Sequence, residues 1–217
     1  MLRVPIGGTD FSTRAYSYND LPENDTALSN FTLAYEDHEY KIPMIKACME
    51  AASTPVHIVS ATWSPPVWMK TNHNYSGYGR LKKEHLQTYA DYHYKFLEKY
   101  AEQGIPVWGI STSNEPLHAS VLYIPLLINN LGWTLDYLLV LFYPDTLKYL
   151  DGVAVHFYMS TYVPASILSQ AMEGYPDKFV LATEICAGVL PTDTKRVDLG
   201  SWSRGELYVR DIIEVTI

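Results

Sequence analysis

Four short apolar stretches, separated by longer stretches of helical character, constrain the fold of this chain more than any other feature. They are rich in β-branched and aromatic residues and nearly continuous in apolarity, as strands buried on both faces are. These predicted strands are residues 56–63, 106–112, 153–158 and 179–183. Residues 38–52 and 82–102 are predicted helices. Strands that alternate with helices predict a parallel sheet.

The second predicted helix has the clearest periodicity. Apolar residues recur there mostly at three- and four-residue steps, which places them on one face of a helix. They are Leu86, Tyr89, Tyr92, Phe96, Leu97 and Tyr100. Gly104 follows at a position suited to end a helix, because glycine adopts the left-handed conformation common at helix C-termini.

Each predicted strand ends at a side chain capable of chemistry. Trp63 ends the first, Asn114 and Glu115 follow the second, His156 lies in the third, and Glu184 follows the fourth. Functional residues at the C-terminal ends of successive parallel strands are typical of a (β/α)8 TIM barrel. A doubly wound open sheet is the alternative. It normally carries a Gly-rich phosphate loop after an early strand, and Gly7-Gly8 does not fit that motif.

The spacing of the two glutamates indicates a missing unit. Glu115 and Glu184 are 69 positions apart, whereas strands four and seven of an average barrel lie about 94 residues apart. The shortage falls between Pro116 and Val153, where we expect irregular structure, with residues 138–143 as a makeshift strand. The sequence therefore predicts a barrel that lacks one internal strand–helix unit.

Composition excludes several classes of protein. The formal charge of −8 in 217 residues argues against nucleic-acid binding, which needs a concentration of Lys and Arg. The most apolar stretch, residues 137–143, is far shorter than the roughly 18 apolar residues of a transmembrane helix. The two cysteines, Cys48 and Cys186, could form one disulfide, although two buried thiols are favoured.

Glu115 and Glu184 are the candidate catalytic pair. Glycoside hydrolysis uses two carboxyl groups on either side of the scissile bond, and retaining enzymes hold them about 5–5.5 Å apart. Asn114 and Pro116 flank Glu115 and make a stiff turn that directs its carboxyl group. The alternative is that both glutamates are ordinary solvated residues past strand ends.

The support for a functional role is weaker for the aromatic residues and for His156. Sugar faces stack on aromatic rings, and Trp63 at a strand end is the ring that we expect to contact substrate. His156 has no second His or Cys at metal-ligand spacing, so we expect a packed or sugar-facing histidine and no metal. A Ser–His–Asp triad has no support, because the chain has no Gly-x-Ser-x-Gly motif.

Several segments, in the same order, resemble the glucosylceramidases of glycoside hydrolase family 30. They are residues 3–12, 63–72, 113–116, 152–158, 182–186 and 199–205. The resemblance implies a retaining β-glucosidase that acts by double displacement without a cofactor. It implies Glu115 as acid/base and Glu184 as nucleophile. It also implies glucose contacts from Asp10, Trp63 and Asn114, with Tyr158 hydrogen-bonding near the nucleophile.

The resemblance further implies an incomplete catalytic domain. Residues 1–217 correspond to a partial (β/α)8 barrel, truncated at both ends, without the β-sandwich domain of the family. The implied substrate is glucosylceramide or a related β-glucoside. A lipid surface and an activator protein are implied partners. The alternatives are a related enzyme that acts on soluble glucosides, and a non-catalytic fragment.

Three glycosylation sequons, at Asn24, Asn30 and Asn74, favour a secretory-pathway protein. With the resemblance, they predict a lysosomal or secreted location, and Asn30 matches a glycosylation position of the family. The sequence shows no signal peptide, and Met1 followed directly by Leu2-Arg3 reads as an internal cut.

Overall fold

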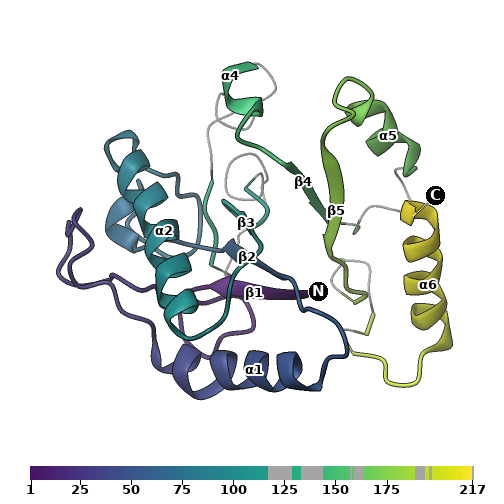
Figure 1. Ribbon diagram of the computed structural model, residues 1–217, viewed down its shortest axis with the longest axis horizontal. Coiled ribbons are helices and arrows are strands. Elements are labelled where there is room, and N and C mark those ends of the chain that lie inside the picture. The colour runs from purple at the N-terminus through teal and green to yellow at the C-terminus, as the bar shows by residue number, and fades with distance from the viewer. Residues whose placement is uncertain are drawn as a thin grey trace. The chain divides into compact units, whose positions relative to one another are not determined.

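The computed structural model describes residues 1–116, 129–132, 144–156, 158, 164–188, 194–195 and 197–216. The chain divides into unit 1, residues 1–139, and unit 2, residues 140–217. Each unit contains parallel strands joined by helices (Figure 1).

Unit 1 is built on a three-stranded parallel sheet. The strands are β1 (Leu2–Ile6), β2 (Ile58–Thr62) and β3 (Gly109–Ser111), in the order β1-β2-β3. Between β1 and β2 the chain forms a π-helical turn (Asp37–Lys41) and α1 (Ile42–Ala51). Between β2 and β3 it forms 3-10 turns at Val67–Met69 and Lys83–His85 and the long helix α2 (Leu86–Glu102). The two crossovers explain why the strands are parallel.

Unit 2 contains a two-stranded parallel sheet. Its elements are α4 (Pro144–Leu147), β4 (Gly152–His156), α5 (Ser166–Met172), β5 (Phe179–Glu184) and α6 (Trp202–Thr216). The pairing runs from Gly152 with Phe179 to His156 with Glu184, and its register is irregular between Val155 and His156.

The predicted strands and helices are all present, with shifted ends. The strand predicted at 106–112 is shorter, and β1 joins it and β2 in the sheet. The prediction of burial on both faces is confirmed for β2, all of whose residues are buried, and is wrong for β3, β4 and β5. Ile110, Val153 and Phe179 are each about two-fifths exposed. These strands are therefore less buried than the near-continuous apolarity of their sequences predicts.

Between Pro116 and Val153 the structure describes residues 129–132 and 144–153. The first group contributes an isolated bridge between Arg80 and Gly132, and the second contains the short helix α4. The makeshift strand expected at residues 138–143 lies outside the described residues.

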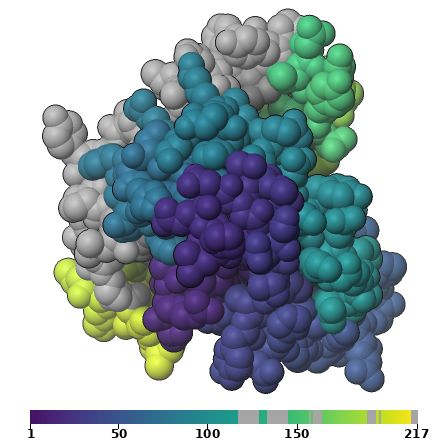
Figure 2. All heavy atoms as spheres, turned by 90° about the vertical axis from the view of Figure 1, so that its left-hand side faces the viewer, coloured from purple at the N-terminus to yellow at the C-terminus, as the bar shows by residue number. Residues whose placement is uncertain are grey.

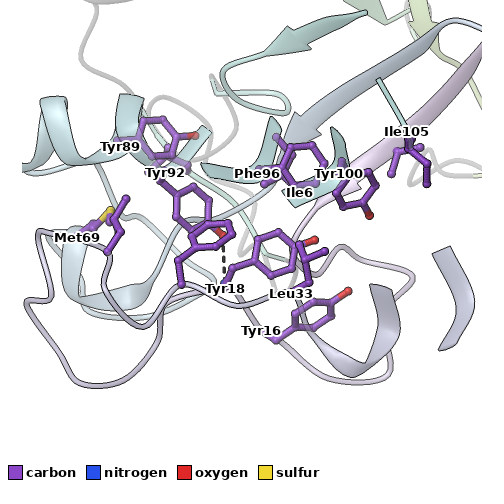
Figure 3. Close-up of a cluster of buried hydrophobic side chains, with 14 of the residues drawn as sticks. Ile6, Tyr16, Tyr18, Leu33, Met69, Tyr89, Tyr92, Phe96, Tyr100 and Ile105 are labelled. Atoms are coloured by element: carbon purple, nitrogen blue, oxygen red, sulfur yellow. Dashed lines mark hydrogen bonds between the residues drawn. The ribbon is translucent and has the colours of Figure 1, made fainter. Parts of the chain in front are cut away.

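An aromatic cluster forms the core of unit 1 (Figure 3). From α2, Tyr92, Phe96 and Tyr100 are fully buried, as their spacing predicts. Tyr18 lies against them, with its ring nearly parallel to that of Phe96 at a centroid distance of 6.1 Å. The Tyr92 hydroxyl accepts a hydrogen bond from the Tyr18 backbone N–H. Gly104, with φ +75°, ends the helix region as predicted.

A buried carboxylate holds this cluster to the helix region before α1. The side chain of Asp37 is fully buried, and its Oδ1 accepts hydrogen bonds of 2.7 Å from the hydroxyls of both Tyr18 and Tyr100. Lys41 Nζ lies 2.8 Å from the same oxygen. Lys41 also donates to the carbonyls of Pro5 and Gly7. This network therefore joins the end of β1 to α2.

On the face turned to the viewer in Figure 2, the start of the chain, in purple and blue, lies beside later residues of unit 1, in teal. The sequons lie on exposed loops of this unit, since Asn24, Asn30 and Asn74 are all exposed. Both cysteines are free thiols. The expectation that both are buried is wrong for Cys48, which is exposed on α1, a helix whose buried residues are Ile42 and Ile45.

Removal of the Asp37 charge tests the buried network. Asp37→Asn leaves the Lys41 ammonium buried without its carboxylate, and we expect the free energy of unfolding in urea to fall by about 3 kcal/mol or more. Glu36→Gln is the matched control. Glu36 pairs with Arg14, whose side chain is 54% exposed, and loss of such a surface pair costs less than about 1 kcal/mol. Equal losses in the two variants would contradict this assignment.

Candidate active site

The end of β2 places Trp63 beneath Arg3. Trp63 follows β2 directly and is buried. The guanidinium of Arg3, from β1, lies 4.7 Å from the centroid of the Trp63 ring. Arg3 alternates in β1 with the buried Val4, so it extends from the opposite face of the strand. One face of the indole is therefore covered by a cation, which a sequence pattern of strand-end aromatics does not predict.

Arg3 also fixes the side chain of Asn114. Arg3 Nη2 donates to Asn114 Oδ1 at 2.6 Å, and the Asn114 backbone N–H donates to the Thr62 carbonyl at 2.8 Å. Because Oδ1 is occupied by Arg3, the amide is oriented with Nδ2 on its other side. Arg3, Trp63 and Asn114 thus form one cluster, made by a side chain of β1 and by the residues that follow β2 and β3.

Glu115 has an unusual backbone conformation. Its φ is +43°, which is uncommon for any residue other than glycine, and it is half-buried. Such a conformation costs on the order of 1 kcal/mol or more and persists where the surrounding structure enforces it. Pro116 follows and restricts the turn further. The stiff turn predicted around Glu115 is therefore present.

A buried lysine supports the loop after β2. Lys70 is fully buried, and its ammonium donates to Ser64 Oγ and to the carbonyls of Tyr75 and Asn130. Burial lowers the pKa of Lys70 to about 7. Trp68, in the same loop, is fully buried in the core, and its Nε1 donates to the Asn19 carbonyl. Hydrogen bonds of the buried Lys70 and Trp68 side chains thus hold this loop in place.

In unit 2, Glu184 lies at the end of β5 within a small polar cluster. The Tyr158 hydroxyl donates to Glu184 Oε1, and it lies 3.5 Å from Cys186 Sγ. His156 Nδ1 lies 3.8 Å from the same carboxylate oxygen. Burial and the bond to Glu184 raise the pKa of Tyr158, so the phenol stays protonated and can donate. The strand-end pattern did not predict the contact of His156 with Glu184 or that of Cys186 with Tyr158.

The predicted residues thus form two groups. Trp63 and Asn114 contact Arg3 in unit 1, and Tyr158 contacts Glu184 in unit 2. Asp10 lies in an exposed turn after β1. Glu115 belongs to unit 1 and Glu184 to unit 2, so the separation of their carboxyl groups stays a prediction.

The whole chain matches a known family. The family described as the glycosyl hydrolase family 30 TIM-barrel domain matches residues 1–137 and 137–216. The match is interrupted at residue 137, inside the stretch predicted to be too short for a regular barrel unit.

Curated relatives agree with this match. The "Putative glucosylceramidase 4" of Caenorhabditis elegans is 36% identical over 98% of this chain and 48% of its own length. The lysosomal acid glucosylceramidase of Mus musculus is 33% identical over 98% of this chain and 48% of its own length. An endo-1,6-beta-D-glucanase of Neurospora crassa is 32% identical over 55% of this chain and 25% of its own length. The chain therefore spans about half the length of the glucosylceramidases that it matches.

The fold has similar solved structures. SrfJ from Salmonella typhimurium superposes with a TM-score of 0.80 over 98% of this chain and 53% of its own, at 24% identity. The endo-beta1,6-glucanase BT3312 gives a TM-score of 0.72 over 86% and 49%, at 22% identity. These likenesses support the fold, and the family match supports a TIM-barrel origin.

Two arginines allow a matched test of the unit 1 cluster. Arg3 and Arg14 each lie 4.7 Å from an aromatic ring, but only Arg3 also bonds a buried amide. We expect Arg3→Gln to lower the free energy of unfolding in urea by about 2 kcal/mol, since a hydrogen bond to a charged group is lost. Arg14→Gln should cost less than about 1 kcal/mol. A loss for Arg14→Gln as large as that for Arg3→Gln would show that the Asn114 contact adds nothing.

Proposed function

We propose that this chain, which belongs to glycosyl hydrolase family 30, is the part of a retaining β-glucosidase that carries both catalytic carboxylates. The chain is a glycoside hydrolase by family. The observation that best supports the assignment of roles is the Glu184 cluster, in which a tyrosine hydroxyl donates to the carboxylate at a strand end. A hydroxyl that donates to one carboxylate oxygen fixes the orientation of the carboxyl group, as a nucleophile that attacks one carbon atom requires.

Glu184 is the proposed nucleophile, and Glu115 is the proposed acid/base. In double displacement, a Glu184 oxygen bonds to the anomeric carbon while Glu115 gives its proton to the leaving oxygen. Water then attacks the glycosyl ester, Glu115 takes the proton from that water, and the Glu184 carboxylate is released. The rigid turn at Glu115 supports this role, because proton transfer requires a carboxyl group held in place.

Asn114, Trp63, Asp10 and Tyr158 are the proposed substrate-binding residues. With Asn114 Oδ1 bound to Arg3, Nδ2 is the group that would donate to a sugar hydroxyl. Arg3 covers one face of Trp63, so a sugar would meet the other face or the edge of the indole. Asp10 is exposed, as a side chain that meets substrate in solution must be.

Glucosylceramide is the proposed substrate, because the relatives that span the whole chain are named glucosylceramidases. A glucan is the second candidate, favoured by the partial match to an endo-1,6-beta-D-glucanase. Hydrolysis of a glycolipid, compared with that of a β-1,6-glucan, separates the two. Binding to a lipid surface and to an activator protein stays a prediction. The described residues contain no helix long and apolar enough to cross a membrane.

A lysosomal or secreted location is part of the proposal, supported by the lysosomal relative and by the exposed sequons. Asn30 is exposed while its Nδ2 donates to Asp25, which leaves its second amide proton for replacement by a sugar.

The assignment of residues 1–217 to a partial barrel without a β-sandwich also stays a prediction.

Substitution of each glutamate tests the roles in the protein that carries this chain. Glu184→Gln should abolish covalent trapping by a mechanism-based glucoside inhibitor, because an amide cannot form the glycosyl ester. Glu115→Gln should keep trapping but lose about 10²–10⁴-fold in rate on substrates with poor leaving groups, and far less on an activated aryl glucoside.

Glu173→Gln is the control, since Glu173 is exposed at the end of α5 in the same unit as Glu184. It should leave trapping and rate unchanged. Trapping that survives in Glu184→Gln, or equal losses on both kinds of substrate in Glu115→Gln, would show that the roles are wrong.

A further inference from the structure

One face of α2 contacts the ends of both β2 and β3 through polar groups. Tyr89 and His93 are four residues apart on α2, so their side chains lie on the same face of the helix. Both are buried, and their rings meet edge to face with centroids 4.4 Å apart. Buried polar groups in a helix require partners, and here the partners are strand ends.

His93 bonds the last residue of β2. Its Nδ1 lies 2.9 Å from the Tyr89 carbonyl, and its Nε2 lies 3.0 Å from Thr62 Oγ1. Because a carbonyl only accepts, Nδ1 carries the proton, and Nε2 of the neutral ring accepts from the Thr62 hydroxyl. Burial lowers the pKa of His93 to about 4, so the ring stays neutral and keeps this arrangement in mildly acidic solution.

Tyr89 bonds the chain directly after β3. Its hydroxyl donates to the carbonyl of Thr112, which follows β3 and precedes Asn114 by two residues. The Asn114 N–H donates in turn to the carbonyl of Thr62, the residue that His93 holds. The side chains of Tyr89 and His93 therefore hold the ends of β3 and β2. The turn of Asn114 and Glu115 begins shortly after β3 and is bonded to the end of β2.

We propose that His93 and Tyr89 are positioning residues for the turn that carries Asn114 and Glu115. They act through Thr62 and Thr112, and they hold the ends of β2 and β3 so that this turn keeps one conformation. The positive φ of Glu115 supports the inference, since a strained residue persists only where its surroundings enforce it. The catalytic consequence rests on the proposed function, whereas the structural consequence does not.

Hydrogen exchange at the Asn114 amide tests the structural consequence on the chain as it is. Tyr89→Phe keeps the ring and His93→Phe replaces the imidazole by a somewhat larger apolar ring, and both remove the polar contacts with the strand ends. Each should raise the exchange rate of the Asn114 amide about tenfold, as expected from the loss of one buried hydrogen bond. His93→Gln retains an amide that can reach Thr62, and it should restore most of the protection that His93→Phe loses.

Tyr92→Phe is the matched control. Tyr92 lies on the same helix and is fully buried, but its hydroxyl accepts from the Tyr18 N–H rather than bonding a strand end of the described residues. It should leave exchange at Asn114 unchanged relative to the global rate. Unchanged exchange at Asn114 in Tyr89→Phe and His93→Phe would overturn the proposal. So would a rise in Tyr92→Phe as large as theirs.

Steady-state kinetics tests the catalytic consequence. Tyr89→Phe and His93→Phe should lower kcat about tenfold with little change in KM, and His93→Gln should recover most of kcat. Absence of glycosidase activity in the parent protein, with the exchange pattern intact, would contradict the proposed function and leave the positioning role standing. Active variants with unchanged kcat would overturn the catalytic part of the positioning proposal.

Discussion

The parallel pairing of β2 with both of its neighbours determines where the candidate site of unit 1 lies. β2 pairs with β1 from Leu2–Ile58 to Ile6–Thr62, and with β3 from Val59–Gly109 to Ala61–Ser111. All five of its residues are buried. Because the strands are parallel, their C-terminal ends meet at one edge of the sheet, and the residues that follow β2 and β3 come together there.

Polar contacts then fix the positions of the side chains at this edge of the sheet. Apolar packing alone tolerates small shifts, whereas hydrogen bonds fix groups to within tenths of an ångström. Arg3 bridges Trp63 and Asn114, and the Thr62 carbonyl accepts the Asn114 N–H. The buried ion pair of Asp37 and Lys41 also holds β1, because Lys41 donates to the Pro5 carbonyl. Burial of these groups is costly when unpaired, so each is a point at which a single substitution should have a large effect.

Much of the fold follows from the sequence because it depends on local patterns. The apolar strands, the spacing of Tyr92, Phe96 and Tyr100 in α2, and the stop at Gly104 can all be read from neighbouring residues. The interrupted family match also agrees with the short spacing between Glu115 and Glu184. The contact of Arg3 with Asn114 joins residues 111 positions apart, and no local sequence pattern predicts it. The exposure of Cys48 and the burial of Lys70 likewise depend on which helix face or loop side packs inward, which only the tertiary structure decides.

We infer that this chain carries the machinery of a retaining β-glycosidase. The anomeric form of the sugar first released tests it most directly, because double displacement retains configuration and single displacement inverts it. Proton NMR of the product of a β-glucoside, recorded before mutarotation, should show the β-anomer first. The α-anomer as the first product would contradict the account.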